Sequence, residues 1–422
     1  RDLRMSRGLG DVYKRQERHC SRNTYYFVII LRHLENLPDF AIYYHYNNSN
    51  FSKLKAKEIK LNKNNILWYL LDMKTNKKKA IVAMSGGVDS SVTALLLQQQ
   101  GYEVEGVTGR MINGACADTI CNNAQRVADK LGIKLHILDV SDKFQEQVIN
   151  NFETSYAKGE TPNPCIICNE FFKWGEIFDY AISKCNADVY ATGHYANIKK
   201  AGNYYKLYPA KDEHKDQLYF LYRLGQKELS KTIFPLYHYD KAEVRQMAYD
   251  YDLPPKSSKE SQDICFIQKP DTTKKYLINK FGSKKGAFID INTGEKLGEH
   301  DGSYLYTIGQ RKGIGIAAPY PLYVIKINAE KNIVYLGRNE DNFRKSLEVK
   351  DLKLSYPIEK NEFDAMVKIR YNMKAQKAHV HIFENAANID FYEKVSSITA
   401  GQSAVFYDLE DGHLIGGGTV CG

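Results

Sequence analysis

One stretch, residues 80–92, constrains the fold of this chain more than any other part of the sequence. It reads Ala-Ile-Val-Ala-Met-Ser-Gly-Gly-Val-Asp-Ser-Ser-Val: a short apolar run, a glycine-rich turn, and the start of a second apolar segment that continues to Gln100. This pattern predicts a buried strand followed directly by a helix, with Gly101 just past the helix end. A tight turn between strand and helix presents backbone N–H groups and the helix N-terminus to an anion.

The residues of this turn suit a phosphate ligand. Gly86 and Gly87 let the backbone approach a phosphate closely, and Ser85 and Ser90 add hydroxyl donors. The turn is not a Walker A loop, because no Gly-Lys-Ser or Gly-Lys-Thr follows it. It resembles the PP-loop of enzymes that split ATP into AMP and pyrophosphate. The alternative is an ordinary glycine-rich turn of an α/β domain.

Strand and helix signals alternate from Lys77 to about Asp188. Strands are predicted over 104–108, 135–140 and 188–192, and helices over 122–131, 142–156 and 169–184. Such alternation predicts a doubly wound parallel sheet, whose ligands bind at the carboxyl ends of the strands. From about Gly286 onward the signals become short alternating strands, with turn residues at 292–294, 329–332 and 410–412. The last third is therefore expected to be β-rich, in a small barrel.

Length and charge set broad limits. A chain of 422 residues is expected to form two or three domains, and no apolar run approaches the 18 residues of a membrane span. The net charge is +9, but residues 1–72 hold 13 Lys and Arg against 7 Asp and Glu, which is six of the nine charges. The remaining residues carry only +3, so the overall basicity is weak evidence for an RNA partner.

Residues 1–72 differ from the rest of the chain. Residues 1–16 resemble translated read-through of a sequencing adapter, and residues 23–68 are rich in Asn, Tyr and Lys without a sustained period. Met73 then leads straight into the first predicted strand. A signal sequence or an extra domain are the alternatives, but a signal peptide needs a basic segment, an apolar segment and a cleavage site that are not found together here. We expect residues 1–72 to be a doubtful leader that is not native coding sequence.

The cysteines are scattered through the chain without a secretory signal, which favours a reducing compartment and makes grouped cysteines candidates for metal binding or catalysis. Cys165 and Cys168 form a Cys-x-x-Cys pair on a loop that two prolines constrain. With a helix predicted from Asn169, Cys168 lies beside a helix N-terminus, which favours a thiolate. Cys265 lies between polar residues and an apolar run. The other cysteines are expected to be small apolar core residues.

From Met73 to Gly422 the chain resembles the MnmA family of tRNA-specific 2-thiouridylases. Besides the PP-loop, six segments carry the resemblance in the same order along the chain: Gly-Glu-Thr-Pro-Asn-Pro with Cys-Asn (159–169), Ala-Thr-Gly-His-Tyr-Ala (191–196), Lys-Asp-Gln (215–217) with Tyr-Phe-Leu, Ser-Gln-Asp-Ile-Cys-Phe (261–266), a His-Asp-Gly to Lys-Gly string (300–313), and Gly-Gln-Ser-Ala-Val-Phe-Tyr (401–407).

The resemblance implies a cytoplasmic enzyme that transfers sulfur to C2 of the wobble uridine of tRNA. ATP, with Mg²⁺, adenylates the uridine oxygen; a cysteine-borne sulfur then replaces AMP, giving 2-thiouridine, AMP and pyrophosphate. It also implies tRNAs of the Lys, Glu and Gln group, a cysteine desulfurase or sulfur-relay protein as donor, and no membrane partner. The implied domains are a PP-loop catalytic domain (73–275), a central tRNA-binding domain (276–340) and a C-terminal β-barrel (341–422).

Site residues follow from the same resemblance. Cys265 carries a persulfide, which Cys168 attacks or resolves as a disulfide. Asn163 and Pro164 face the target base. The implied tRNA contacts are Lys215, Asp216, Gln217, Arg370 and Tyr371. The implied ATP-binding residues are Ala83, Met84, Ser85, Gly86, Gly87, Val88, Asp89, Ser90, Gly109 and Gly193.

The chain departs from the family pattern at two positions. Cys165 stands where many members have an aspartate as acid/base, and a thiol with an ordinary pKa near 8.5 is a different base from a carboxylate. Cys165, Cys168 and Cys265 are then three candidate ligands for a 4Fe–4S cluster with one open iron; zinc suits the Cys-x-x-Cys spacing equally. Gly109 stands at the position of the adenine-contacting Met, with Met111 two residues later.

Two other functions compete with this interpretation. Another PP-loop enzyme, such as an amidotransferase-type ligase or a thiolase for a different base, would need neither Cys168 nor Cys265 and would not carry the 300–313 string. A non-catalytic RNA-binding protein with the same fold would release no pyrophosphate from ATP.

Overall fold

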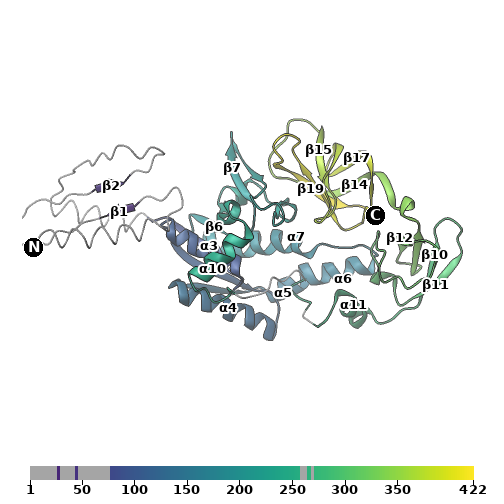
Figure 1. Cartoon of the computed structure of the whole chain (residues 1–422), viewed down its shortest axis with the longest axis horizontal. Coiled ribbons are helices and arrows are strands. Elements are labelled where there is room, and N and C mark those ends of the chain that lie inside the picture. The colour runs from purple at the N-terminus through teal and green to yellow at the C-terminus, as the bar shows by residue number, and fades with distance from the viewer. Residues whose placement is uncertain (1–25, 29–42, 46–76, 257–263, 268–269) are drawn as a thin grey trace, which may run out of the picture. The chain divides into compact units, whose positions relative to one another are not determined.

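The computed structural model describes residues 26–28, 43–45, 77–256, 264–267 and 270–422 (Figure 1). The chain divides into two units, residues 1–77 and 78–422. In the first, β1 (Tyr26–Val28) pairs antiparallel with β2 (Tyr43–His45). Most of the expected leader, residues 1–72, lies outside the described residues.

The second unit begins with a five-stranded parallel sheet in the order β5-β4-β3-β6-β9. Its strands are β3 (Lys79–Ala83), β4 (Glu103–Arg110), β5 (Leu135–Asp139), β6 (Val189–Ala191) and β9 (Thr232–Ile233). The predicted doubly wound sheet is confirmed, because crossover helices lie between successive parallel strands. β3 is central, and its three middle residues, Ala80, Ile81 and Val82, are fully buried, as expected for an apolar run in a sheet that is covered on both faces.

Helices cover both faces of this sheet. On one face Ala80 and Val82 of β3 pack with residues of α3 (Val88–Gln99) and α4 (Ala115–Leu131). On the other face Ile81 packs with residues of α8 (Ile177–Ser183) and the π-helical segment before it. Gly101 follows α3 with φ +88°, as predicted. α4 begins seven residues before the predicted start at 122.

The helix that carries the Cys-x-x-Cys pair starts earlier than the sequence suggested. α7 (Pro164–Cys168) continues through the π-helical segment η3 (Asn169–Glu176) into α8. Pro164 takes the first helical position, where its fixed φ and missing N–H cost nothing. The prediction that Cys168 lies beside a helix N-terminus is therefore wrong: Cys165 lies in the first turn, and Cys168 lies at the end of α7.

The remaining helices connect or flank the sheet. The segment predicted as one helix over 142–156 consists of α5 (Ser141–Phe144), the π-helical η2 (Gln145–Ile149) and α6 (Asn150–Ala157). The others are α9 (Gln226–Leu229), α10 (Lys241–Asp250) and α11 (Thr273–Phe281). A hairpin of β7 (Asn197–Ala201) and β8 (Tyr204–Tyr208) follows β6. In the part of the chain that the structure describes, no helix has the length and apolar character needed to cross a membrane.

The predicted β-rich last third is confirmed as two bodies. A four-stranded sheet has the order β11-β10-β13-β12, from β10 (Gly286–Asp290), β11 (Lys296–His300), β12 (Tyr323–Asn328) and β13 (Ile333–Gly337). A closed six-stranded barrel follows, from β14 (Phe343–Leu354), β15 (Glu362–Lys368), β16 (Gln376–Phe383), β17 (Ala386–Ser396), β18 (Ser403–Tyr407) and β19 (Leu414–Val420). The barrel has its own apolar core and no open sheet edge.

Candidate active site

The glycine-rich turn lies at the carboxyl end of β3 and leads into α3, which is the geometry of an anion site. Ser85 and Ser90 face each other across it, with their hydroxyl oxygens 3.4 Å apart. Gly86 has φ +71°, and a Cβ there would lie 2.6 Å from the Cβ of Asn123 on α4. Only glycine fits this position, so α4 fixes the path of the loop.

Asp89, in the first turn of α3, is held by two residues that were not among the predicted site residues. The Lys241 ammonium lies 2.6 Å and 2.7 Å from its two carboxylate oxygens, and the Tyr195 hydroxyl donates to one of them at 3.0 Å. Tyr195 belongs to the Ala-Thr-Gly-His-Tyr-Ala string, so that match was a signal. Lys241, at the start of α10, is 152 residues from Asp89 in sequence, and no local pattern relates the two.

Gly193 and Gly109 border the same edge of the sheet. A Cβ at Gly193 would lie 2.8 Å from the Asp89 carbonyl carbon and the Ser90 nitrogen, so this glycine lets the chain after β6 rest against the start of α3. A Cβ at Gly109 would lie 2.8 Å from the Met111 methyl group. The Met111 side chain therefore folds back beside Gly109, where a side chain at 109 would stand.

The surroundings of the three candidate cysteines favour the thiol over the thiolate. Burial raises the pKa of Cys168 to about 12 and that of Cys265 to about 11, and it also raises the pKa of Cys165, although Cys165 and Cys265 reach the surface. Lys173 is the cation that opposes each of these shifts. A negative charge on Cys265 would raise the pKa of Cys168 further, and the two cysteines are not disulfide-bonded. The thiolate expected at Cys168 is thus not what its surroundings favour in the unliganded protein.

Lys173 also joins the cysteines to the end of β6. Its ammonium lies 3.4 Å from Nε2 of His194, and Nδ1 of that ring lies 2.7 Å from the Thr192 hydroxyl. Burial holds the pKa of His194 well below its usual value, so the ring is neutral and can accept from Lys173. Sequence reasoning did not single out Lys173; its place on the π-helical segment, a rare form frequent at functional sites, is visible only in the structure.

The same cysteines do not form a ready site for a single metal ion. Zinc holds thiolates at ~2.3 Å, so the sulfurs that share one ion lie within about 4.6 Å of one another. Among the described residues, three ligand atoms come within 4.8 Å of one another at Glu105, His136 and Cys185, and at Asp408, Asp411 and His413. Cys165, Cys168 and Cys265 do not form such a group. The cysteine sulfurs that bind a four-iron cluster lie farther apart than those that share one ion, so this distance criterion does not apply to a cluster.

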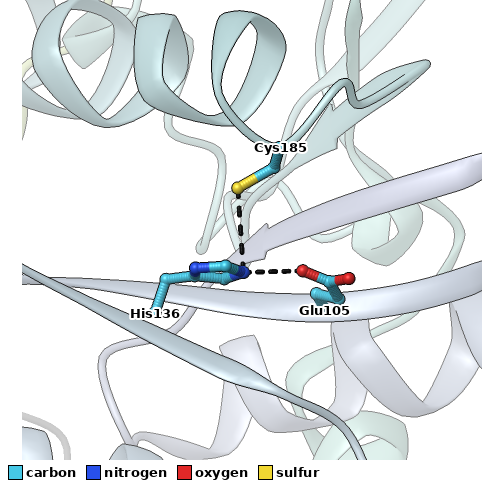
Figure 2. Close-up of side chains that lie close together, drawn as sticks. All are labelled: Glu105, His136 and Cys185. Carbon is cyan, nitrogen blue, oxygen red and sulfur yellow. Dashed lines mark hydrogen bonds and ion pairs between the residues drawn. The ribbon is translucent and has the colours of Figure 1, made fainter.

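Figure 2 shows the first of these groups, at the sheet edge opposite the glycine-rich turn. Glu105 and His136 lie in the amino-terminal halves of β4 and β5, and Cys185 lies between α8 and β6. Nε2 of His136 lies 2.6 Å from Glu105 and 3.7 Å from the Cys185 sulfur (Figure 2). Lys79 pairs with the other Glu105 oxygen at 2.7 Å, and the Tyr180 hydroxyl meets Nδ1 of His136 at 3.1 Å. Charges and hydrogen bonds are balanced in this network without a metal ion.

Residues from two distant parts of the chain hydrogen-bond to Thr161, in the loop before α7. Its N–H donates to the Ala400 carbonyl at 2.8 Å, its carbonyl accepts from the Gln402 side chain at 2.8 Å, and its hydroxyl donates to that of Thr307 at 3.1 Å. We name these four residues the Thr161 clasp. A Cβ at Gly401 would lie 3.1 Å from Glu160, so glycine permits this approach. The clasp brings together three of the sequence strings, 159–169, 300–313 and 401–407.

Asn163 and Pro164 follow the clasp directly. Asn163 caps α7 through its backbone, with its side chain making no capping hydrogen bond, and Pro164 is buried. The loop that was expected to face the target base is thus fixed from one side by the clasp and from the other by the first turn of α7.

The residues expected to contact tRNA come from two distant segments that the fold brings together. The Tyr371 ring packs on Phe220 with centroids 4.5 Å apart, and the charges of Lys215 and Asp216 reach Tyr371. Asp216 accepts from two backbone amides, at 3.0 Å and 3.2 Å, and burial raises its pKa to about 6. The Asp216 carboxylate therefore fixes the backbone of this segment by accepting hydrogen bonds inside the protein.

Gln217 and Arg370 are also engaged inside the protein. The Gln217 side chain accepts from the Tyr195 backbone at 3.0 Å. Arg370 donates to the Ile308 carbonyl at 2.7 Å and to the Thr399 hydroxyl, joining the barrel to the 300–313 string. Its Nε is buried without a hydrogen-bond partner, and burial lowers its pKa. Both side chains position neighbouring loops in the unliganded protein.

Comparison with known proteins agrees with this architecture. Residues 78–269 match a family described as the tRNA methyl transferase HUP domain, residues 274–338 match the tRNA methyl transferase PRC-barrel domain, and residues 344–420 match an aminomethyltransferase β-barrel domain.

Relatives are similar over nearly their whole length. The chain is 41% identical over 358 residues to tRNA-specific 2-thiouridylase MnmA 2 of Clostridium botulinum, covering 82% of this chain and 99% of that protein. It is 42% identical over 360 residues to MnmA 2 of Clostridium tetani, with the same coverage. It is 42% identical over 361 residues to MnmA of Carboxydothermus hydrogenoformans, covering 82% and 98%.

Solved structures show more distant likenesses. The U34-tRNA thiolase NcsA of Methanococcus maripaludis, with its [4Fe-4S] cluster, is 19% identical with a TM-score of 0.31, covering 45% of this chain and 61% of that one. A 4-thiouridine synthetase in complex with RNA and ATP is 20% identical with a TM-score of 0.29, covering 43% of each. Structural similarity at these TM-scores says nothing about the residues of the site.

Proposed function

Because the chain belongs to the family of tRNA-specific 2-thiouridylases, we propose how its residues divide the work of thiolating tRNA. The chain is an ATP-dependent tRNA uridine thiolase and hence a tRNA sulfurtransferase. One observation carries this conclusion: a relative 41% identical matches over 99% of its own length, so the similarity extends over the sheet domain, the four-stranded sheet and the barrel and is not confined to one domain. The reaction that we assign is transfer of sulfur to C2 of the wobble uridine.

ATP makes this transfer possible because the C2 oxygen of uridine is a poor leaving group until it is adenylated. The loop Ser85–Ser90 and the N-terminus of α3 hold the pyrophosphate, with Mg²⁺ accompanying ATP. The remaining nucleotide-binding positions are Ala83, Met84, Gly109 and Gly193, which lie at the carboxyl edge of the sheet or beside it. The glycine at 86 and the close packing of Gly193 on Asp89 support this assignment.

Sulfur can be carried in two ways, and in the first, a persulfide relay, it reaches the uridine through Cys265 and Cys168. A cysteine desulfurase or relay protein loads Cys265 as a persulfide. The Cys168 sulfur then attacks the inner sulfur of that persulfide, forms a disulfide with Cys265, and releases hydrosulfide, which attacks C2 as AMP leaves. A thiol reductant regenerates the pair. Support comes from the charge of Cys265, which acts on the pKa of Cys168, and from Lys173, the cation that opposes the effect of burial on the pKa of both thiols.

A second way to hold sulfur rests on Cys165, because it replaces the acid/base aspartate of the family pattern. Cys165, Cys168 and Cys265 offer three soft thiolate ligands in one electrostatic neighbourhood, which suits a 4Fe–4S cluster better than a single zinc ion. Bound there, a cluster would supply an open iron position for an inorganic sulfur ligand. We favour the cluster over the persulfide.

The tRNA side of the site follows the same assignment. Asn163 and Pro164 are placed at the target uridine, and the segments of Lys215–Gln217 and of Arg370 and Tyr371 border the tRNA. The substrates are the tRNAs of the Lys, Glu and Gln group, in the cytoplasm. The domains are residues 73–275, 276–340 and 341–422, in line with the three matched families; residues 1–72 are a leader outside the enzyme.

The test is a thiolation assay on the full chain with tRNA, ATP and a sulfur donor, in which 2-thiouridine is measured by mass spectrometry beside AMP and pyrophosphate. Cys168→Ala and Cys265→Ala should each lower thiolation at least 100-fold, and the control Cys421→Ala should not. Full activity without Cys168 or Cys265 would favour another PP-loop enzyme. Failure of the wild type to release pyrophosphate would favour a non-catalytic RNA-binding protein.

Cys165→Asp separates the cluster from the persulfide. The exchange restores the commoner family residue, so a persulfide enzyme should keep or gain activity. In a cluster enzyme the exchange replaces a soft thiolate by a carboxylate, which is a harder and weaker ligand for iron. Such an enzyme should lose iron and become more sensitive to oxygen. Iron content and visible absorbance of anaerobically purified protein give the readout. Wild-type protein that thiolates tRNA at full rate without iron would exclude the cluster.

A further inference from the structure

The phosphate loop contains a carboxylate that ought to repel a phosphate. Asp89 is the second residue of α3, in the turn whose backbone amides are offered to an anion. Its side chain is only 33% exposed, so water screens it poorly. Unopposed, this negative charge would weaken the binding of pyrophosphate or of the triphosphate of ATP.

Lys241 opposes that charge directly. Its ammonium contacts both oxygens of Asp89, at 2.6 Å and 2.7 Å, and its side chain is only 12% exposed. The Tyr195 hydroxyl completes the arrangement by donating to Asp89 at 3.0 Å. Two donors thus fix the carboxylate in one orientation.

The position of Lys241 is itself fixed. Asp240 and Glu243 form a capping box at the start of α10, and the Lys241 N–H donates to Asp212 at 3.0 Å. α10 packs against α3 through a shared apolar cluster of Val88, Val92, Leu95, Val244, Ala248 and Leu253. The lysine therefore reaches the loop from a rigid helix end whose distance from α3 is set by packing.

We propose that Lys241 is a positioning residue of the phosphate loop: by pairing with Asp89 it cancels the negative charge of the loop and keeps the backbone amides available to pyrophosphate. This inference rests on the proposed ATP site. It differs from two simpler roles of Lys241, which are direct contact with the phosphates and a purely structural tie between α3 and α10.

The experiment measures binding of inorganic pyrophosphate, in the presence of EDTA, to the full-length protein by calorimetry. Omitting metal separates the charge of Asp89 from any part that it has in holding Mg²⁺. Lys241→Met should weaken pyrophosphate binding at least tenfold, and Lys241→Arg should restore most of it. The control Lys227→Met, on α9, breaks an exposed ion pair with Asp179 of α8 and should leave binding unchanged.

The double variant Asp89→Asn with Lys241→Met decides between the roles. If Lys241 acts through Asp89, the double variant should bind pyrophosphate at least fivefold more tightly than Lys241→Met alone. If Lys241 contacts phosphate directly, or only ties two helices together, removal of Asp89 should give no such recovery, and the proposal is then wrong.

Two further measurements keep the outcome clear. Should Lys241→Met fail to fold, Asp89→Asn alone carries the test, because an unopposed Lys241 should bind pyrophosphate as tightly as the wild type or more so; a tenfold weakening would overturn the proposal. Wild-type protein that forms no AMP and pyrophosphate from ATP with tRNA would instead defeat the proposed function, whatever the variants show.

Discussion

At the scale of single residues, the sulfur chemistry depends on how a buried thiol becomes reactive. Cys168 has its pKa raised to about 12 by burial, which disfavours the thiolate, while Lys173 pulls in the opposite direction. Lys173 hydrogen-bonds to the neutral ring of His194. Because that partner carries no negative charge, the positive charge of Lys173 can still stabilise a sulfur anion. Reactivity should therefore appear only when tRNA or a sulfur donor changes the surroundings of Cys168.

Alkylation of Cys168 in the free protein should show this directly. A thiol with a pKa near 12 carries a thiolate fraction that rises about tenfold for each unit of pH between 7 and 10, so the rate with iodoacetamide should rise in the same proportion. Mass spectrometry of the peptide that contains Cys168 measures it. Free glutathione, with an ordinary pKa, should level off above about pH 9. A Cys168 rate that is already flat at pH 8 would mean that the thiolate is formed in the resting protein.

At the scale of elements, the Thr161 clasp explains how a loop with two prolines is held in one place. Prolines restrict the loop backbone, but the three hydrogen bonds that Thr161 makes with Thr307, Ala400 and Gln402 decide where it lies. These partners come from the 300–313 string and from the turn before β18. The position of the helix that carries the Cys-x-x-Cys pair is thus fixed by residues more than 140 positions away in the sequence.

Gln402→Ala should separate positioning from stability. Loss of one side chain-to-backbone hydrogen bond costs about 1 kcal/mol of unfolding free energy, but a displaced catalytic loop should lower the rate of thiolation about tenfold or more. Gln98→Ala is the matched control, because its amide donates to the Leu131 carbonyl at 3.0 Å within the PP-loop domain. Denaturant unfolding and single-turnover thiolation give the two readouts. Equal losses of activity in both variants would remove the clasp from the catalytic account.

The elements that the sequence predicted well are those set by local rules. The strand, turn and helix over 80–101 follow from an apolar run, two glycines and helical periodicity, and the barrel follows from alternation and turn residues. The start of α7 was misplaced because a proline at the first helical position was taken for part of an extended loop. The pairing of Lys241 with Asp89 could not be predicted, since 152 residues separate them and only the packing of α10 on α3 brings them together.

At the scale of the whole molecule, residues 78–422 form one unit in which the barrel is tied to the sheet domain. The buried Tyr219 hydroxyl donates to the Ser403 carbonyl at 2.9 Å, and the Gln226 side chain donates to the Ser355 carbonyl at 2.7 Å. Apolar residues of β18 and β19, Val405 and Leu414, belong to the same core cluster as the sheet domain. Unfolding of either part should therefore disturb the other.

A chain that begins at Met73 should fold and thiolate tRNA as well as the full chain. The first matched family begins at residue 78, and the compact unit begins at Lys78, so no catalytic element that we assign lies earlier. Thermal unfolding and the rate of 2-thiouridine formation are the measurements. A fall of several degrees in the unfolding temperature, or a tenfold loss of rate, would show that residues 1–72 contribute to the enzyme.

The Thr161 clasp also limits how this protein can be recombined. The barrel looks like a separable module, closed on itself with its own core, yet Ala400 and Gln402 hydrogen-bond to the backbone of the loop that leads into α7, the helix that carries Cys165 and Cys168. In a chimera that takes its barrel from a relative, the residues at positions 400 and 402 would come from a protein in which they contact a different loop. Exchange of modules should therefore preserve activity only when residues 159–163, 306–310 and 399–402 are transferred together.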